Sequence, residues 1–320
     1  MRPFFTLIVP CYNAIAYIEQ GIKSLENQTY NNFEVIFVDD CSIDNTFNFL
    51  LEYKSKTSLN VTVLKNDINC GPGQSRNNGI KKAKGSYITF MDSDDWLEET
   101  FFEEMHNCII KNNADIVQCD FSRFYKGEKH WIKCTQNLKS ELKKNVIIAQ
   151  TVSSLCILAI KKDLFNDIKI PQLYNAEDVI IIPQLFSKAT SVAFIHKPLY
   201  VYLYLPTSLS KKNDKKVVTS FINGFYELKK VIPNIYEDAI EFLGIKMVLY
   251  GASFNAIRID MNKREIFNFV DAFINEYPDC LKNSYFKTLP IRKRFYIKAV
   301  YNKQYWLLYL YSRIHHLMLN

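Results

Sequence analysis

The first 120 residues of this 320-residue chain alternate between the periods of strands and helices, and this alternation limits the fold more than any other feature. Short apolar runs, the pattern of buried strands, occupy residues 4–9, 33–38, 61–64, 86–91 and 115–119. Helical spacing of apolar residues occupies residues 15–27, 42–54, 72–84 and 98–112. Strands that are apolar nearly throughout and separated by helices are typical of a mostly parallel sheet with helices on both faces. We therefore predict an α/β fold for this part of the chain.

The remaining residues predict a second, helical part. Residues 122–150 are polar and lysine-rich without a clear period, and residues 151–210 return to apolar segments. Helical spacing prevails after residue 215. We predict two domains, an α/β domain at residues 1–215 and an α-helical C-terminal region at residues 216–320.

Composition predicts a globular protein of the cytoplasm. Hydrophobic residues make up 48% of the chain and charged residues 23%. No apolar run approaches the roughly 18 residues that span a bilayer, and the run at residues 4–9 is too short for the core of a signal peptide. The eight cysteines lie singly, without the spacing of a metal site, which favours reduced thiols.

The net charge of +7 belongs to the C-terminal tail, because residues 281–320 contain eight Lys and Arg and no Asp or Glu. Basic residues mixed with Trp and Tyr indicate an interfacial helix, so we predict peripheral attachment of residues 282–320 to an anionic surface, the inner face of the cell membrane. The alternative is a C-terminal helix packed on the domain or at the contact of a homodimer. We predict no nucleic-acid partner.

Three of the predicted strands end in polar side chains that can do chemistry. The first is followed by Pro10, Tyr12 and Asn13, the second by Asp39 and Asp40, and the fourth by Asp92, Ser93, Asp94 and Asp95. In parallel sheets, ligands bind outside the carboxyl ends of the strands. We therefore expect these residues to meet at one edge of the sheet.

Each acidic group has a functional and a structural interpretation. Asp92 and Asp94 can hold a divalent cation together with a substrate diphosphate, or can cap a helix at residues 96–104, where Asp95 is the best candidate for the cap. Asp39 and Asp40 can accept hydrogen bonds from a base or a ribose, or can share the capping of the next helix with Ser42 and Asp44.

Two further groups complete the candidate site. Arg76 lies in a glycine-rich stretch at residues 71–79, where it can contact a base or a phosphate or can be a solvated side chain beside a tight turn. Gly85 is expected to end the helix at residues 72–84. The carboxylates Glu177 and Asp178 open an apolar segment, and either form an acidic helix N-terminus or supply a general base.

The order of these motifs resembles the family-2 glycosyltransferases with the GT-A fold. The resemblance rests on TLIVPCYNA, LENQTYNNFEVIFVDDCSIDNT, NCGPGQSRNNGIKKAKGSYITFMDSDDW and AEDV, and is dense over the first 120 residues. It implies a Rossmann-like domain and an inverting transfer of one sugar from a nucleotide-sugar donor. The expected donor is a UDP-hexose or a UDP-N-acetylhexosamine. The expected acceptor is a hydroxyl of a glycan or lipid-linked molecule in lipooligosaccharide, capsule or O-antigen synthesis.

The resemblance also implies roles for single residues. Asp92 and Asp94 are expected to hold Mn²⁺ or Mg²⁺, and Asp178 of the Glu177–Asp178 pair to deprotonate the acceptor. The nucleotide-sugar is expected to contact Pro10, Tyr12, Asn13, Asp39, Asp40, Arg76, Asp92 and Ser93.

The sequence departs from the family at Leu203, where relatives often carry an Arg. Diphosphate contacts from Tyr202, Tyr204, Ser208, Lys211 or Lys212 are the candidates that replace it. The QxxRW motif of processive synthases is absent, which favours addition of a single residue. A nucleotidyltransferase and a non-catalytic nucleotide-sugar-binding scaffold are the two alternatives to a glycosyltransferase.

Overall fold

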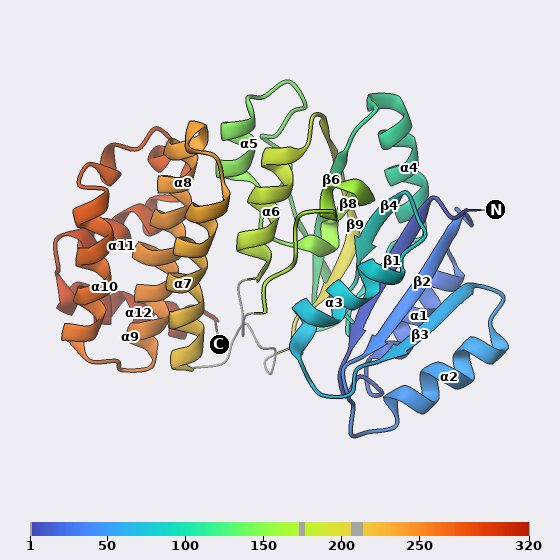
Figure 1. The fold of residues 1–320 in the computed structure, drawn as a ribbon. Helices are drawn as coiled ribbons and strands as arrows, with labels where there is room; N and C mark the ends of the chain where they lie inside the picture. Colours follow the sequence, from blue (N-terminus) through green and yellow to red (C-terminus); the bar gives the residue numbers. More distant parts are fainter. Residues whose placement is uncertain (1, 173–176, 206–213, 320) are drawn as a thin grey trace. The chain divides into compact units, whose positions relative to one another are not determined.

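The computed structural model of the chain describes residues 2–172, 177–205 and 214–319, with side chains up to Arg313 (Figure 1). The chain divides into two compact units. Unit 1 comprises residues 1–142, 150–172 and 185–205, and unit 2 comprises residues 143–149, 173–184 and 206–320. The predicted domain boundary at residues 215 and 216 stays a prediction.

Unit 1 is built on one mixed sheet with the strand order β3-β2-β1-β4-β8-β6-β9-β5, and β7 pairs with β6 outside this path. Its strands are β1 (Phe5–Cys11), β2 (Phe33–Asp39), β3 (Asn60–Lys65), β4 (Tyr87–Phe90), β5 (Trp96–Leu97), β6 (Ile116–Tyr125), β7 (Glu128–Ile132), β8 (Leu158–Lys161) and β9 (Val192–Leu203). Its helices are α1 (Ile18–Glu26), α2 (Thr46–Lys56), α3 (Gly71–Lys82), α4 (Phe101–Asn112), and the short 3-10 turns η1 (Leu155–Ile157) and η2 (Lys162–Phe165).

The predicted α/β class is confirmed, and the sheet is mixed rather than wholly parallel. Strands β1, β2, β3 and β4 pair in parallel, as do β6 and β9, whereas β8 runs antiparallel to both β4 and β6. All seven residues of β1 and all seven of β2 are buried. Strands buried on both faces need layers above and below them, which explains why these segments read as continuous apolar runs.

Two local predictions in unit 1 are wrong. The expected helix start at residue 96 is instead strand β5, whose Trp96 and Leu97 pair with Val201 and Tyr200 of β9. Helix α4 begins at Phe101 rather than at residue 98. Gly85 does not end α3, which closes at Lys82 with Ala83 as its C-cap. A Cβ on Gly85 would lie 2.5 Å from the Thr6 nitrogen, so a glycine is needed there for the close approach to β1.

Unit 2 is helical, as predicted for the C-terminal region. Its longer helices are α7 (Lys215–Val231), α8 (Glu237–Gly244), the π-helix η5 (Ile245–Ala252), α9 (Ser253–Arg258), α10 (Lys263–Glu276), α11 (Ile291–Tyr301) and α12 (Tyr305–Leu319). The short 3-10 turns are η4 (Asn234–Tyr236), η6 (Cys280–Lys282) and η7 (Phe286–Thr288). Most of α5 (Lys144–Gln150) and the first eight residues of α6 (Glu177–Lys188) also belong to this unit.

One helix of unit 2 meets the length and composition of a bilayer span, contrary to the expectation that no such segment exists. It covers Asn234–Arg258, 25 residues, and its most apolar window has a mean hydropathy of 1.3. That window is 78% buried within the protein. Burial of this extent is also the pattern of a core helix, so this helix is weak evidence for a span.

Candidate functional site

The loops that follow β1 and β2 are joined to each other by backbone and side-chain hydrogen bonds. Cys11 pairs with Asp39 in the parallel register, and the Asp40 N–H donates to the Cys11 carbonyl at 2.8 Å. The Asn13 N–H donates to Ser42 Oγ at 3.0 Å, and Asn13 Oδ1 accepts from the Ile43 N–H at 3.0 Å. Asn13 has a left-handed backbone with φ of 50°. The structure therefore brings two of the predicted strand ends together and holds them in a fixed geometry.

Asp39 has a buried oxygen that the folded chain does not use. Its side chain is fully buried, and Oδ2 accepts from the Ser42 N–H at 3.2 Å. Within the part of the chain that the structure describes, Oδ1 has no hydrogen-bond partner. A buried carboxylate oxygen without a donor is costly, so its natural complement is a ligand N–H or O–H.

Both carboxylate oxygens of Asp40 accept hydrogen bonds from the segment around the start of α3. Its Oδ1 accepts from Asn66 Nδ2 at 2.7 Å and from the Cys70 N–H at 3.0 Å, and its Oδ2 accepts from the Gly71 N–H at 2.7 Å. Gly71 has a φ of +82°, which other residues adopt only with strain. Asp40 thus fixes the start of α3, and its predicted contact with a nucleotide stays a prediction.

Arg76 and Asp92 form an ion pair that joins α3 to the end of β4. Arg76 Nη2 lies 2.7 Å from Asp92 Oδ1. The Arg76 side chain is 4% exposed, whereas that of Asp92 is 41% exposed. The glycine-rich stretch therefore forms a helix whose buried cation orients the first carboxylate of the acidic motif.

Asp94 is the most electrostatically perturbed accessible carboxyl of the motif. Burial, and then the charge of Asp92, raise the pKa of Asp94 to about 6. Two carboxylates in this proximity disfavour each other's ionisation until a cation or a proton lies between them. A cation bound at this point would therefore relieve the repulsion.

The residue types here fit a divalent metal bound partly by the substrate. Mg²⁺ and Mn²⁺ accept oxygen ligands, and Mg²⁺ is commonly held by one or two carboxylates together with substrate phosphates and water. Asp92 and Asp94 supply two such carboxylates. Among the described residues there is no group of three or more His, Cys, Asp or Glu side chains that could hold a metal.

Asp95 has a role that the local sequence did not reveal, and its predicted capping role is wrong. Thr100 is the N-cap residue of α4. Asp95 is buried, Oδ2 accepts from the Tyr200 hydroxyl, and Oδ1 accepts from the Leu203 N–H at 2.7 Å. The Tyr200 hydroxyl also accepts from the Asp92 N–H at 3.2 Å. Burial, followed by Asp92 and Asp94, holds the pKa of Asp95 well above its usual range.

The capping of α2 is also only partly as predicted. Asp44 Oδ1 accepts from the Thr46 N–H at 2.9 Å, at the first residue of the helix. Ser42 instead receives the Asn13 N–H, so it joins the two strand-end loops.

The remaining candidates are placed separately. Tyr12 is 48% exposed and Pro10 is buried at the end of β1. Glu177 and Asp178 lie in the first turn of α6, in the portion that belongs to unit 2, and their catalytic roles stay predictions. Ser208, Lys211 and Lys212 lie outside the described residues.

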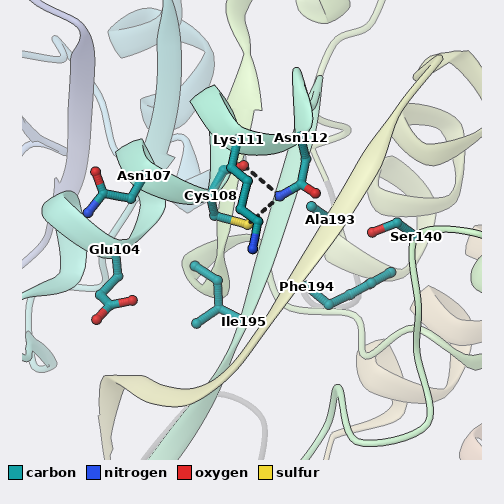
Figure 2. A pocket seen from close by; sticks show the side chains of 9 residues that line it. All are labelled: Glu104, Asn107, Cys108, Lys111, Asn112, Ser140, Ala193, Phe194 and Ile195. Carbon is teal, nitrogen blue, oxygen red and sulfur yellow. Dashed lines mark hydrogen bonds between the residues drawn. The ribbon is translucent and has the colours of Figure 1, made fainter.

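A cavity of about 370 Å³ lies in unit 1 at the start of β9 (Figure 2). It is lined by α4, by Ser140 and by β9 at Ala193, Phe194 and Ile195. The Asp95 contacts use Tyr200 and Leu203, at the opposite end of the same strand. None of the predicted site residues lines this cavity.

Comparison with known proteins identifies the family. The model of glycosyl transferase family 2 matches residues 6–167, about half of the chain. A poly(ribitol-phosphate) beta-N-acetylglucosaminyltransferase, TarS of Staphylococcus aureus strain Mu50, is 28% identical over 236 residues. This match covers 71% of the present chain and 39% of TarS, so the chain spans about two fifths of that relative.

Solved structures share the fold. The crystal structure of S. aureus TarS 1–349 in complex with UDP-GlcNAc aligns with a TM-score of 0.72 at 22% identity, covering 97% of this chain and 92% of that one. A mannosyltransferase of Pyrobaculum calidifontis, in complex with GDP-Man and Mn²⁺, aligns with a TM-score of 0.59 at 15% identity, covering 96% and 88%.

Proposed function

Because the chain belongs to glycosyl transferase family 2, we propose that it moves one sugar, with inversion, from a UDP-sugar to a hydroxyl of a cell-surface glycan. N-Acetylglucosamine is the favoured sugar, because the similar TarS structure contains UDP-GlcNAc. A hexose is the alternative within the same donor class.

The observation that carries the proposal is the unused oxygen of Asp39 at the same sheet edge as the Asp92 and Asp94 carboxylates. Strands β2 and β4 both pair in parallel with β1, so their ends flank the end of β1. Two strand spacings separate those ends by about 10 Å. A nucleoside diphosphate can extend along this edge, with its base at Asp39 and its phosphates towards Asp92.

The uracil base offers a donor that matches Asp39. Uracil N3–H can donate to Asp39 Oδ1, the buried atom without a partner among the described residues. Cytosine has no proton on N3, so this contact favours UDP over CMP donors. The Arg76 pair holds Asp92 in place for the ribose or for a metal.

The proposed chemistry is a single displacement. The acceptor oxygen attacks the anomeric carbon, the bond from that carbon to the diphosphate oxygen breaks, and UDP leaves. Asp178 takes the proton of the acceptor hydroxyl, because an alcohol is a weak nucleophile near neutral pH. Asp92 and Asp94 would hold Mn²⁺ or Mg²⁺, which supplies a Lewis acid for the negative charge on the departing diphosphate.

The proposed acceptor is a glycan or lipid-linked molecule of the bacterial surface, such as lipooligosaccharide, capsule or O-antigen. The name of TarS adds poly(ribitol phosphate) to this class. We propose that the protein is peripherally attached to the inner face of the cell membrane, where a lipid-linked acceptor would be accessible to it.

Helix α12 supports that attachment. Trp306, Tyr309, Leu310 and Arg313 are all exposed and follow the spacing i, i+3, i+4, i+7, which places them on one face. Trp306 is 67% exposed and Leu310 49%. Trp, Tyr and Arg on one face of a helix, in a segment without acidic residues, are suited to the headgroup region of an anionic leaflet.

Vesicle flotation tests the attachment. The double variant Trp306→Ser, Leu310→Ser should lose flotation with phosphatidylglycerol vesicles. The control Ile235→Ser removes an apolar side chain that is 80% exposed elsewhere in unit 2 and should float as the wild type does. Equal flotation of all three proteins would remove α12 from the account.

The transfer itself is tested by UDP release from UDP-GlcNAc with Mn²⁺, with and without acceptor glycan. Asp94→Asn and Asp178→Asn should each abolish transfer, and only Asp94→Asn should weaken metal-dependent donor binding. Asp271→Asn, at an exposed ion pair with Lys303, is the control and should turn over normally. Near-normal turnover by Asp178→Asn would refute the base assignment, and donor binding without any turnover would favour the non-catalytic scaffold.

A further inference from the structure

Strands β6 and β9 carry a cation and aromatic rings on the face that touches the acidic motif. The two strands pair in parallel, with Phe121 opposite Tyr200 and Arg123 opposite Tyr202. Alternate residues of a strand share a face, so Tyr200, Tyr202 and Arg123 lie on the same side. The Tyr204 N–H donates to the Phe124 carbonyl at 3.0 Å, which continues the ladder by one residue and places Tyr204 on this side as well.

The contacts of Tyr200 show which side this is. Its hydroxyl meets both the Asp95 carboxyl and the Asp92 N–H. Tyr202 follows by two residues, or about 7 Å along the strand, and Arg123 lies one strand spacing of about 5 Å to the side. The side chain of Arg123 therefore starts on the sheet face that bears the acidic motif, within reach of a molecule bound there.

Arg123 is held by rings rather than by an acid. Its guanidinium carbon lies 5.5 Å from the centroid of the Tyr204 ring, and that ring packs edge-on against Tyr125 at 4.9 Å. Arg123 is exposed, and within the described ranges no carboxylate forms an ion pair with it. An arginine oriented by stacking keeps its N–H fork for an anion, and phosphate matches that fork in two-point contact.

The position in the sheet points to the acceptor rather than to the donor. In the strand order, β4 and β8 separate β6 from β1, which puts Arg123 about 15 Å from the edge formed by β1 and β2. Arg76 already supplies the buried cation on the side of β1. Lys126, with its Nζ 5.2 Å from the centroid of the Tyr125 ring, adds a second positive charge next to Arg123.

We infer that Arg123, stacked on Tyr204, binds the phosphate of an anionic acceptor, such as a polyol-phosphate or a sugar-phosphate chain. The neighbouring tyrosine rings offer flat faces for the polyol or sugar beside that phosphate. This inference rests on the proposed glycosyltransferase activity, because it assigns the acceptor of the same site.

Direct binding tests the assignment without turnover. The probe is a synthetic poly(ribitol phosphate) octamer titrated into the full-length protein. Maltooctaose is the neutral comparison, and a separate titration with UDP-GlcNAc and Mn²⁺ measures donor binding. Arg123→Gln should raise the Kd for the octamer about tenfold, the scale of one lost charged contact, and leave the Kd for UDP-GlcNAc unchanged. Arg264→Gln, at an exposed arginine of unit 2, is the charge-matched control and should bind as the wild type does.

Tyr204 provides a second arm that separates orientation from charge. Tyr204→Leu removes the ring and should raise the Kd for the octamer severalfold. Tyr204→Phe keeps the ring and should bind the octamer as the wild type does. The inference is overturned if the wild type does not bind the octamer, if Arg123→Gln binds it normally, or if Arg123→Gln weakens only UDP-GlcNAc, which would assign Arg123 to the donor diphosphate. Failure of the wild type to bind UDP-GlcNAc would count against the proposed function and not against Arg123.

Discussion

The buried contact between Tyr200 and Asp95 should be a main source of stability in unit 1, and Tyr200→Phe tests it. Phenylalanine fills the same ring volume, so the variant removes a hydroxyl without leaving a cavity. That hydroxyl donates to the Asp95 carboxyl and accepts from the Asp92 N–H. Asp95 is 1% exposed, so water cannot replace the lost donor.

The expected cost follows from these two hydrogen bonds. The hydroxyl is the partner of both the Asp95 oxygen and the Asp92 N–H, and a buried polar group left without its partner costs about 1–3 kcal/mol. Tyr200→Phe should therefore lower the free energy of unfolding of unit 1 by about 2–4 kcal/mol.

Urea unfolding followed by tryptophan fluorescence measures the cost. In a Trp306→Phe background, the signal comes from Trp96 and Trp131, both of which lie in unit 1. Tyr87→Phe is the matched control, since the Tyr87 hydroxyl donates to one backbone carbonyl at 2.9 Å, and it should cost about 1 kcal/mol. A cost for Tyr200→Phe no larger than that of Tyr87→Phe would refute the reasoning.

Three further changes have expected outcomes of their own. Gly85→Ala places a Cβ 2.5 Å from a backbone nitrogen of β1 and should lower the free energy of unfolding in urea by about 2–3 kcal/mol. Gly71→Ala meets open space but has a φ of +82°, so it should lower that free energy by about 1–2 kcal/mol. A variant as stable as the wild type would contradict the geometry in either case. Burial, and then Lys293, lower the pKa of Lys246 to about 8, so the unfolded state binds more protons between about pH 8 and pH 10.5 and stability from this group rises across that window. Lys246→Met should therefore be more stable than the wild type at pH 7, by about 1–3 kcal/mol, and lose that advantage by pH 10.5; a difference that does not change with pH would contradict the shift.

Local patterns in the sequence predicted the buried strands of unit 1. They failed where an element depends on contacts with residues far away in the chain. The strands β1 and β2 are buried at every position, so their apolar runs were readable without knowledge of their neighbours. The segment after Asp95 resembled an acidic helix start, because Glu98 and Glu99 follow it. Its pairing with β9, more than 100 residues away, makes it a strand instead, and no local signal encodes that partner.

The strand ends that carry the candidate residues were predictable, whereas the hydrogen bonds among those residues were not. The strand-end rule placed Asp39 and Asp92 on one edge before the fold was known. The use of Asp40 to fix the start of α3, and the pairing of Arg76 with Asp92, depend on side-chain reach across the folded chain. Tyr200 was not among the predicted site residues, since nothing adjacent to it in the sequence indicates a buried carboxylate partner.

Titration calorimetry of the full-length protein with UDP and with UDP-GlcNAc, each with and without Mn²⁺, tests the central claim most directly. The wild type should bind both ligands and bind them more tightly with Mn²⁺. Asp39→Ala should weaken binding under both conditions, because it removes the acceptor for uracil, whereas Asp94→Asn should remove only the gain from Mn²⁺. Absence of binding by the wild type, or equal binding by both variants, would contradict a UDP-sugar site at the ends of β1, β2 and β4.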